Sequence, residues 1–194
     1  MSVSAFGLVK AVLDSALMKS SKLLALALSF TLAGCIGIDT AKANKKVEES
    51  NAAMEAANKA IKEGNEATQD AATKAVTDPD AAADPAKKCV AKLDEASGKV
   101  DEASKLLKEA ADMKVTKEFS DYLSLMSKAH AKVSETIDVQ KTFCKSLTTK
   151  AEPEKISDAV KKMQSDIDAK QKEAQDLQDQ ADKIRKDNPS KFQQ

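Results

Sequence analysis

The sequence predicts an all-α fold, an elongated antiparallel up-down bundle of four long helices. Apolar residues recur at alternating steps of three and four along four segments, which is the periodicity of amphipathic helices. Only five glycines occur in 194 residues, and no run alternates apolar and polar residues as a half-buried strand does. Alanine supplies much of the 42% apolar content, which favours closely packed helices over a thick α/β interior.

The first segment ends before Asp78 and Pro79 and carries the weakest apolar stripe. It offers few large apolar side chains, and Gly64 in its middle costs ~1 kcal/mol of helix stability relative to alanine. Two arrangements remain open: a helix docked by close alanine contacts, which we favour, and a semi-detached stalk beside a three-helix bundle. The stripe consists of Val47, Ser50, Met54, Ala57, Ile61, Gly64, Thr68, Ala71 and Ala75.

The second segment is predicted to begin with Asp84 as the N-cap and Pro85 at the first helical position, where proline is tolerated. It extends to a weak break between Met113 and Thr116, which contains β-branched residues. Its expected buried positions are Val90, Leu93, Ser97, Val100, Ser104, Leu107 and Ala111.

The third and fourth segments are divided by a break from Thr148 to Pro153, where the proline suits a helix start. The average step of 3.5 residues is the coiled-coil repeat and predicts small crossing angles. Segments of roughly 30 to 38 residues give helices ~50 Å long. The two stripes are Phe119, Leu123, Met126, His130, Val133, Ile137, Gln140, Cys144, Leu147, and Ile156, Val160, Met163, Ile167, Lys170, Ala174, Leu177, Ala181, Ile184.

Near the N-terminus, an apolar run from Leu23 to Ala33 follows two lysines and ends in the tetrad Leu32, Ala33, Gly34, Cys35. This arrangement resembles the lipobox of a bacterial lipoprotein precursor. The resemblance implies that Cys35 becomes the mature N-terminus, with a thioether-linked diacylglycerol and an acylated amine. Together with the helical pattern, this divides the chain into three expected parts: a signal peptide over 1–34, a helical bundle domain over 35–187, and a flexible C-terminal tail over 188–194. The tail begins where Asn188 and Pro189 end the last helix.

Two other interpretations of this segment compete with the lipobox. A retained transmembrane helix is disfavoured, because Leu23–Ile38 is shorter than the ~20 residues that cross a bilayer. An ordinary signal peptide cut after Ala43 would make Asn44 the N-terminus and discard the cysteine. The signal is already complete from Met18, so the preceding residues are either an extended basic region or the result of a start codon assigned too early.

If Cys35 is acylated, the remaining thiols are Cys89 and Cys144, in a compartment where disulfides persist. Facing residues of an antiparallel hairpin are equidistant from its turn, and the midpoint of this pair falls beside the break at Val115 and Thr116. We therefore predict a Cys89–Cys144 disulfide that joins the start of the second helix to the end of the third, worth ~4 kcal/mol by the chain-entropy model. The alternative is two buried free cysteines that act as small apolar side chains.

The charge distribution argues against nucleic acid as a partner. The chain has 31 basic and 31 acidic residues, and loss of residues 1–34 removes three lysines and one aspartate, which leaves a formal charge of −2. Charges so balanced give no attraction to phosphate backbones, and an aromatic content of 3% offers few platforms for base stacking.

We predict no catalytic residue, no metal site and no cofactor. His130 is the only histidine, and its place on the apolar stripe of the third helix favours a core imidazole over a general base. A zinc site needs several His or Cys ligands, and the chain offers one histidine and no Cys-x-x-Cys pair. It also has no glycine-rich loop of the kind that binds phosphate.

The lipobox resemblance implies a lipid-anchored, non-catalytic protein of the cell envelope that binds or braces while facing the periplasm. Ile36 follows the cysteine in place of the aspartate that retains enterobacterial lipoproteins in the inner membrane, which implies the outer membrane. The expected partners are the membrane, through the N-terminal lipid, and an envelope protein or a second copy of the chain, through helix faces. The alternative is a soluble periplasmic or secreted inhibitor or adaptor released after Ala43, and an enzyme that uses His130 is a third hypothesis.

Overall fold

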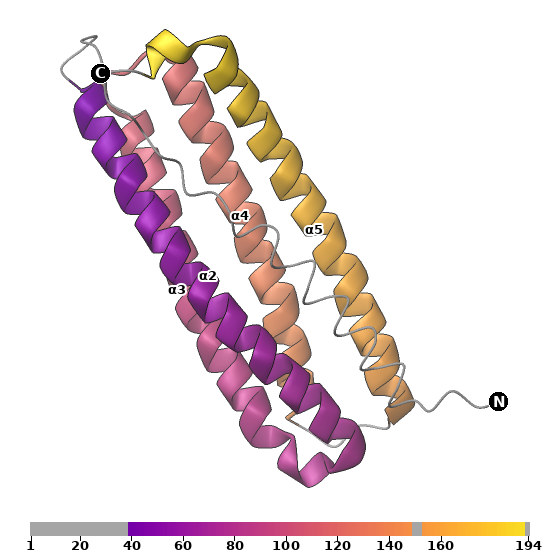
Figure 1. Cartoon of the computed structure of the whole chain (residues 1–194). Coiled ribbons are helices and arrows are strands. Elements are labelled where there is room, and N and C mark those ends of the chain that lie inside the picture. The colour runs from indigo at the N-terminus through magenta and orange to yellow at the C-terminus, as the bar shows by residue number, and fades with distance from the viewer. Residues whose placement is uncertain (1–38, 149–152, 193–194) are drawn as a thin grey trace.

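Four long helices account for most of the described chain, and consecutive helices run antiparallel (Figure 1). The computed structural model describes residues 39–148 and 153–192. The predicted all-α up-down bundle is confirmed, and the described residues contain no strand. The elements are α2 (Thr40–Thr77), the 3₁₀ turn η2 (Pro79–Ala81), α3 (Ala83–Ala111), α4 (Lys117–Ser146), α5 (Pro153–Asp187) and the 3₁₀ turn η3 (Pro189–Lys191).

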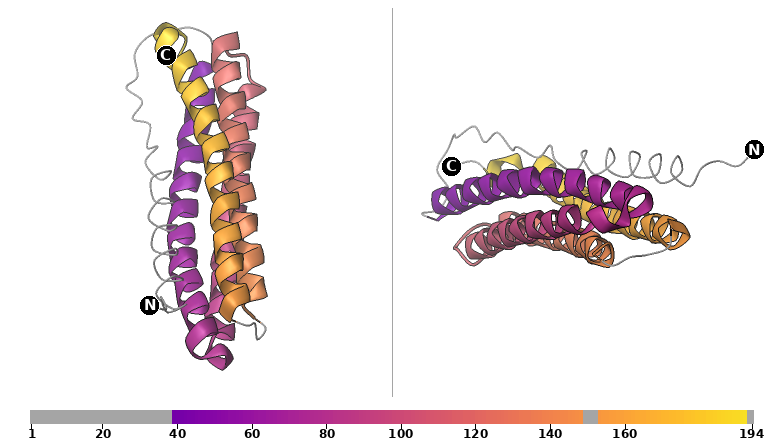
Figure 2. Two further views of the ribbon diagram at one scale, coloured as in Figure 1. Left: turned by 90° about the vertical axis from the view of Figure 1, so that its right-hand side faces the viewer. Right: turned by 90° about the horizontal axis from the view of Figure 1, so that it is seen from below.

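The helices form an elongated rod in which sequence neighbours pack side by side (Figure 2). α2 packs on α3, α3 on α4 and α4 on α5, whereas α2 meets α4 and α5 in only a few places. The start of α2 and the end of α5 lie at the same end of the rod (Figure 1). The predicted signal peptide, with Cys35, lies outside the described residues.

α2 is docked on α3 along its length and is not a stalk. Its buried face consists mainly of alanines, so the two backbones approach closely. A Cβ placed on Gly64 would lie 2.9 Å from Leu93 Cδ2, which means that the glycine makes room for this fully buried leucine. Further along the same interface, Ser50 Oγ donates a hydrogen bond to the carbonyl oxygen of Ala103 at 3.0 Å.

Helix ends follow the predicted breaks with one correction. The Thr116 hydroxyl caps α4 by accepting from the Phe119 amide at 3.3 Å, and Pro153 is the first residue of α5. α3, however, begins at Ala83 with Ala82 as its N-cap residue, so Asp84 and Pro85 lie inside the first turn. The first-turn amides of a helix have no intrahelical acceptor, so Pro85 causes no loss of hydrogen bonding there.

The positions predicted to be buried are mostly buried in α4 and less often so in α3. Leu93, Val100 and Leu107 are buried as expected, but the remaining predicted positions of α3 are only half-buried. α3 packs against both α2 and α4, and the closely approaching α2 backbone selects the alanine next to each predicted serine. The buried residues that replace the predicted ones are Cys89, Ala96, Ala103 and Ala110.

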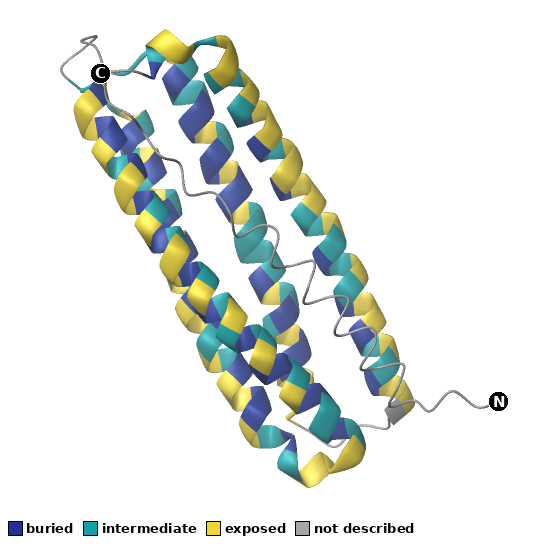
Figure 3. Cartoon of the chain, in the orientation of Figure 1, coloured by how far each residue is buried: buried dark blue, intermediate teal, exposed yellow. Residues whose placement is uncertain are grey.

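Buried positions run along the inner faces of the helices (Figure 3). The interior consists of two apolar clusters separated by a layer of small and polar side chains. One cluster, which includes Leu93, Ile137 and Ile156, fills the half of the rod near the α2–α3 connection. The other, which includes Leu107 and Leu123, fills the half that contains the start of α2. The buried residues between the two clusters are Ser50, Ala53, Ala103, Ser127, Ala129, His130, Ala174 and Gln178.

Residues 188–192, which fall within the predicted flexible tail, pack onto the bundle. α5 ends at Asp187 as expected, but the η3 turn then brings Phe192 back onto the bundle. Its ring centroid lies 5.1 Å from that of Phe119 and 5.3 Å from that of Tyr122. Burial of an aromatic side chain is favourable enough to order a short terminal segment.

Candidate functional site

A disulfide joins Cys89 near the start of α3 to Cys144 near the end of α4, as predicted. The two Cα atoms lie 6.2 Å apart, and neither residue is exposed to solvent. The bridge lies in the half of the rod far from the α3–α4 turn. The α3–α4 hairpin is therefore closed by its turn at one end and by the disulfide at the other.

Polar side chains of α2 and α4 that hydrogen-bond to one another, Asn65, Thr68 and Gln140, cover the disulfide. Thr68 Oγ1 lies 3.1 Å from Cys89 Sγ and 3.3 Å from Cys144 Sγ. Its single proton is donated to the carbonyl oxygen of Gly64 at 2.8 Å, so the approach to the sulfurs is a packing contact. Gln140 Nε2 donates to Thr68 Oγ1 at 2.9 Å and to Asn65 Oδ1 at 2.6 Å, which ties α4 to α2 directly above the bridge.

His130 lies in the polar layer of the core, 4% exposed, and not in an open cleft. Burial lowers the pKa of its imidazole from 6.5 to about 4, and no charged group contributes to the shift. Its Nδ1 has no hydrogen-bond partner in the described chain, and neither has Oε1 of Gln178, which belongs to the same layer. The imidazole is therefore neutral at physiological pH.

Ion pairs between helices connect all three pairs of packed neighbours. Lys92 binds Glu63 of α2 at 2.7 Å, and Lys141 of α4 binds Asp94 of α3 at 2.8 Å. The hydrogen bond from Lys92 lowers the pKa of the Glu63 carboxyl. These side chains are partly exposed, between 19% and 57%, so solvent screens the pairs and we expect each to contribute little to stability and mainly to set the register of the helices.

α4 and α5 share a closed ring of four alternating charges. Lys132 binds Glu135 at 2.8 Å and Glu173 at 2.9 Å, and Lys170 binds Glu135 at 2.7 Å and Glu173 at 3.8 Å. Hydrogen bonds from both lysines lower the pKa of the Glu135 carboxyl. The ring fixes α5 against α4 at one end of a surface groove.

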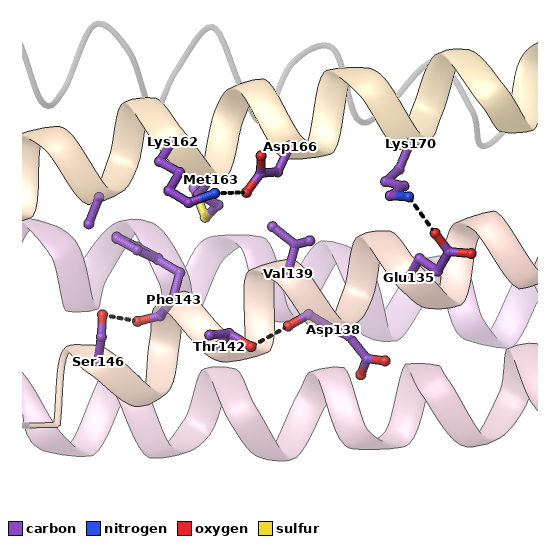
Figure 4. Close-up of a pocket in the computed structure, with 11 residues that line it drawn as sticks. Glu135, Asp138, Val139, Thr142, Phe143, Ser146, Lys162, Met163, Asp166 and Lys170 are labelled. Carbon is purple, nitrogen blue, oxygen red and sulfur yellow. Dashed lines mark hydrogen bonds and ion pairs between the residues drawn. The ribbon is translucent and has the colours of Figure 1, made fainter.

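This groove has a volume of about 520 Å³ and lies between the second half of α4 and the first half of α5 (Figure 4). Its floor is apolar and is formed by Val139, Phe143, Ala159 and Met163. Two hydroxyl groups also line it, but they donate to carbonyls of their own helix: Thr142 to Asp138 at 2.9 Å and Ser146 to Phe143 at 2.7 Å. We refer to this site as the α4/α5 groove.

The rim of the α4/α5 groove is charged. Asp138 on the α4 side and Lys162 on the α5 side have side chains 64% and 76% exposed. Asp138 lies 3.5 Å from Lys141, which is closer to Asp94, and Lys162 contacts Asp166 at 2.6 Å. The Lys170–Glu135 pair crosses the groove at the end nearest the polar layer.

Sequence reasoning missed the α4/α5 groove, although a signal for it exists. Val139 and Phe143 are one residue before stripe positions on α4, and Ala159 is one residue before a stripe position on α5. Each helix therefore has an apolar face that is wider than its predicted stripe, and the added residues of the two helices lie at the same height along the rod. Only the packing of α4 against α5 brings the two widened faces together.

A second groove of about 410 Å³ lies between α3 and α4 and is lined mainly by polar and charged residues. Its lining includes Ser104, Lys108 and Ser127 together with exposed acidic residues, and it lacks an apolar floor. Across residues 39–148 and 153–192, no group of His, Cys, Asp and Glu is arranged to hold a metal ion. Within the same residues, no helix has the length and apolar character of a membrane span.

The chain matches no family model, no curated protein sequence and no solved structure. Its function is therefore inferred from its own residues.

Proposed function

We propose that this protein is a lipid-anchored, non-catalytic component of a bacterial cell envelope, a helical rod that binds or braces a partner on the periplasmic side of the outer membrane. The observation that carries the proposal is the resemblance of residues 32–35 to a lipobox, directly after an apolar run with lysines before it. Acylation of Cys35 would hold the rod at the membrane, since several acyl chains bind a bilayer stably.

The buried disulfide supports the exported location. Disulfides persist in the periplasm and outside the cell, whereas the reducing cytosol keeps thiols free. The partners Cys89 and Cys144 lie on two different helices and are brought together by the fold. The bridge is consistent with folding in an oxidising compartment.

The position of the tetrad relative to α2 also supports the proposal. α2 begins at Thr40, so the chain between Cys35 and the rod spans at most ~17 Å. A tether of this length would keep the end of the rod that contains Phe192 near the bilayer. The connection between α2 and α3, at the other end, would then lie farthest from it.

Cleavage after Ala43, which would release a soluble protein, fits the fold less well. Ala43 is fully buried and Thr40 nearly so, and both lie in the first turns of α2. A cut at this site would remove them and place a charged amino group on Asn44, which is 2% exposed. Burying an unpaired charge is costly, whereas a cut before Cys35 leaves α2 complete.

Metabolic labelling with palmitate tests the anchor. The full-length chain, expressed in a Gram-negative host, is expected to incorporate label and to fractionate with the outer membrane. Cys35→Ser is expected to lose the label and to accumulate as the unprocessed precursor, while the matched change Cys144→Ser, at a buried cysteine, leaves labelling intact. Labelling that persists in Cys35→Ser would refute lipid attachment at this residue.

A further inference from the structure

We propose that the α4/α5 groove binds an amphipathic helix of a partner protein, with its apolar face on the groove floor and charges of opposite sign along its two flanks. This inference extends the proposed binding role by assigning it a surface and a class of partner. The groove, with its volume of about 520 Å³ and its mainly apolar lining, gives the partner an apolar strip about one helical turn long on each side.

The groove floor is suited to aliphatic side chains. Val139 and Phe143 are four residues apart on α4, and Ala159 and Met163 are four residues apart on α5, so each pair lies along one face of its helix. Figure 4 shows the side chains of Val139, Phe143 and Met163 directed toward the space between the helices. The Thr142 and Ser146 hydroxyls already donate to backbone carbonyls, so they place no unused proton on the floor.

The rim charges select the partner's flanks. Asp138 presents an exposed carboxylate on the α4 side, and Lys162 presents an exposed ammonium on the α5 side. A helix that lies between them gains from a cation facing α4 and an anion facing α5. This pattern of an apolar seam with charged flanks is the one by which helices choose partners in coiled coils.

The place of the groove along the rod favours a protein partner over the lipid surface. Under the proposed anchoring, the membrane lies at the end where α5 finishes, at Asp187. Met163 precedes that residue by 24 positions, which is ~36 Å along a helix. A tether of at most ~17 Å leaves the groove well outside the bilayer.

Three fluorescent synthetic helices of about four turns test the proposal. They share one leucine seam and carry, on the two flanks, lysine and glutamate, lysine on both, or glutamate on both. Binding to the purified full chain, with its disulfide formed, is followed by fluorescence anisotropy. The mixed-flank helix is expected to bind more tightly than the other two, by about threefold for each rim charge that is matched.

Charge reversals on the rim are expected to change this preference in opposite directions. Lys162→Glu makes both rims acidic and is expected to favour the all-lysine helix, whereas Asp138→Lys makes both basic and is expected to favour the all-glutamate helix. An affinity order that is the same in the wild type and in both variants would overturn the proposal.

Two alanines of α5 provide a matched pair for the floor. Ala159 lines the groove, and Ala169 is exposed elsewhere on the same helix. Ala159→Glu is expected to weaken binding of the mixed-flank helix by at least about tenfold, because a carboxylate replaces apolar floor, and Ala169→Glu leaves it unchanged. Equal losses in the two variants, or a dimer of the chain that Ala159→Glu dissociates in sedimentation, would overturn the assignment of a heterologous helix.

This experiment is independent of the test of the proposed function. Peptide binding takes place in solution and does not require the lipid. A wild-type chain that incorporates no palmitate would remove the anchor and leave the groove assignment standing, while failure of peptide binding would leave the anchor standing.

Discussion

At the scale of single residues, burial determines the chemistry of His130. The imidazole lies in a layer whose other members are small or polar, and no carboxylate compensates for its loss of solvent. A charged imidazolium in this position would lack the stabilisation that water gives it in the unfolded chain. The histidine therefore couples the stability of the fold to pH.

We predict that His130 destabilises the fold on acidification. Its pKa is about 4 in the fold and near 6.5 in the unfolded chain, so its contribution to stability is fully present above about pH 6.5. Between these values the unfolded chain binds a proton that the folded chain does not. The free energy of unfolding is expected to fall by ~3 kcal/mol as the pH decreases through this window.

Urea unfolding of the wild type and of His130→Gln measures this contribution. Glutamine is neutral at every pH, and the carboxylates with lowered pKa values, such as Glu63 and Glu135, act equally in both proteins and cancel in the difference. The stability of the wild type relative to the variant is expected to decrease from about pH 7 to about pH 4. Parallel stability curves would show that the imidazole titrates normally in the fold.

Gly64 shows what the sequence leaves open at this scale. Helix propensity alone indicates that a glycine at this position lowers helix stability, and the residue does lie in the middle of α2. The structure adds the reason for its presence, which is the contact with Leu93 across the α2–α3 interface. No single-segment pattern contains this information, because the neighbour is on another helix.

At the scale of elements, the C-terminal turn η3 acts as a cap on one end of the bundle. Phe192 packs against Phe119 and Tyr122 of α4, and the Tyr122–Phe192 rings meet nearly edge-on, at 84°. Burial raises the pKa of the Tyr122 phenol to about 12. The chain contains one tyrosine and no tryptophan, so tyrosine absorbance reports this end of the rod alone.

We predict that Phe192→Ala exposes Tyr122 and lowers the free energy of unfolding by about 2 kcal/mol. The loss is below the 3–5 kcal/mol typical of a buried phenylalanine, because a terminal segment can detach without leaving a closed cavity. The pKa of Tyr122 is expected to fall from about 12 toward 10, which ultraviolet titration measures.

The matched control for this change is Phe143→Ala, at a phenylalanine of similar burial in the other apolar cluster. It is expected to destabilise the protein while leaving the Tyr122 pKa high. An unchanged tyrosine pKa in Phe192→Ala would mean that η3 does not shield the phenol.

The helices and their ends were largely predictable from the sequence. The face by which each helix packs against its neighbour was predictable only in part. Local signals placed a break at Thr116, which caps α4, and a helix start at Pro153, which begins α5, because caps and prolines act within one turn. The α3 stripe was displaced toward Ala96 and Ala103, since α2 approaches closely enough to prefer alanine. The α4/α5 groove was not predicted: the sequence contains the widened apolar faces of the two helices, but whether these faces meet depends on the rotation of one helix against the other.

At the scale of the whole molecule, two kinds of contact with different roles hold the helices together. Apolar clusters fill its two halves, and ion pairs such as Lys141–Asp94 and Lys92–Glu63 fix the helices in register at the surface. The Cys89–Cys144 bridge closes the α3–α4 hairpin beneath Thr68 of α2. α2 therefore both stabilises the hairpin and shields its covalent link.

The disulfide is expected to contribute about 4 kcal/mol to the free energy of unfolding, since it closes a loop across a sequence separation of 55 residues. Because both sulfurs are fully buried beneath α2, dithiothreitol is expected to reduce the bridge slowly in native buffer and much faster in urea below the unfolding midpoint, where α2 opens. Thiol trapping over time measures the rate, and Cys89→Ala combined with Cys144→Ala gives the stability of the unbridged fold.

Thr68→Ala is expected to accelerate reduction of the disulfide by loosening the packing over it, whereas Thr73→Ala, at a half-buried threonine of α2 away from the bridge, is not. Rapid reduction of the wild type without urea would show that α2 does not protect the bridge.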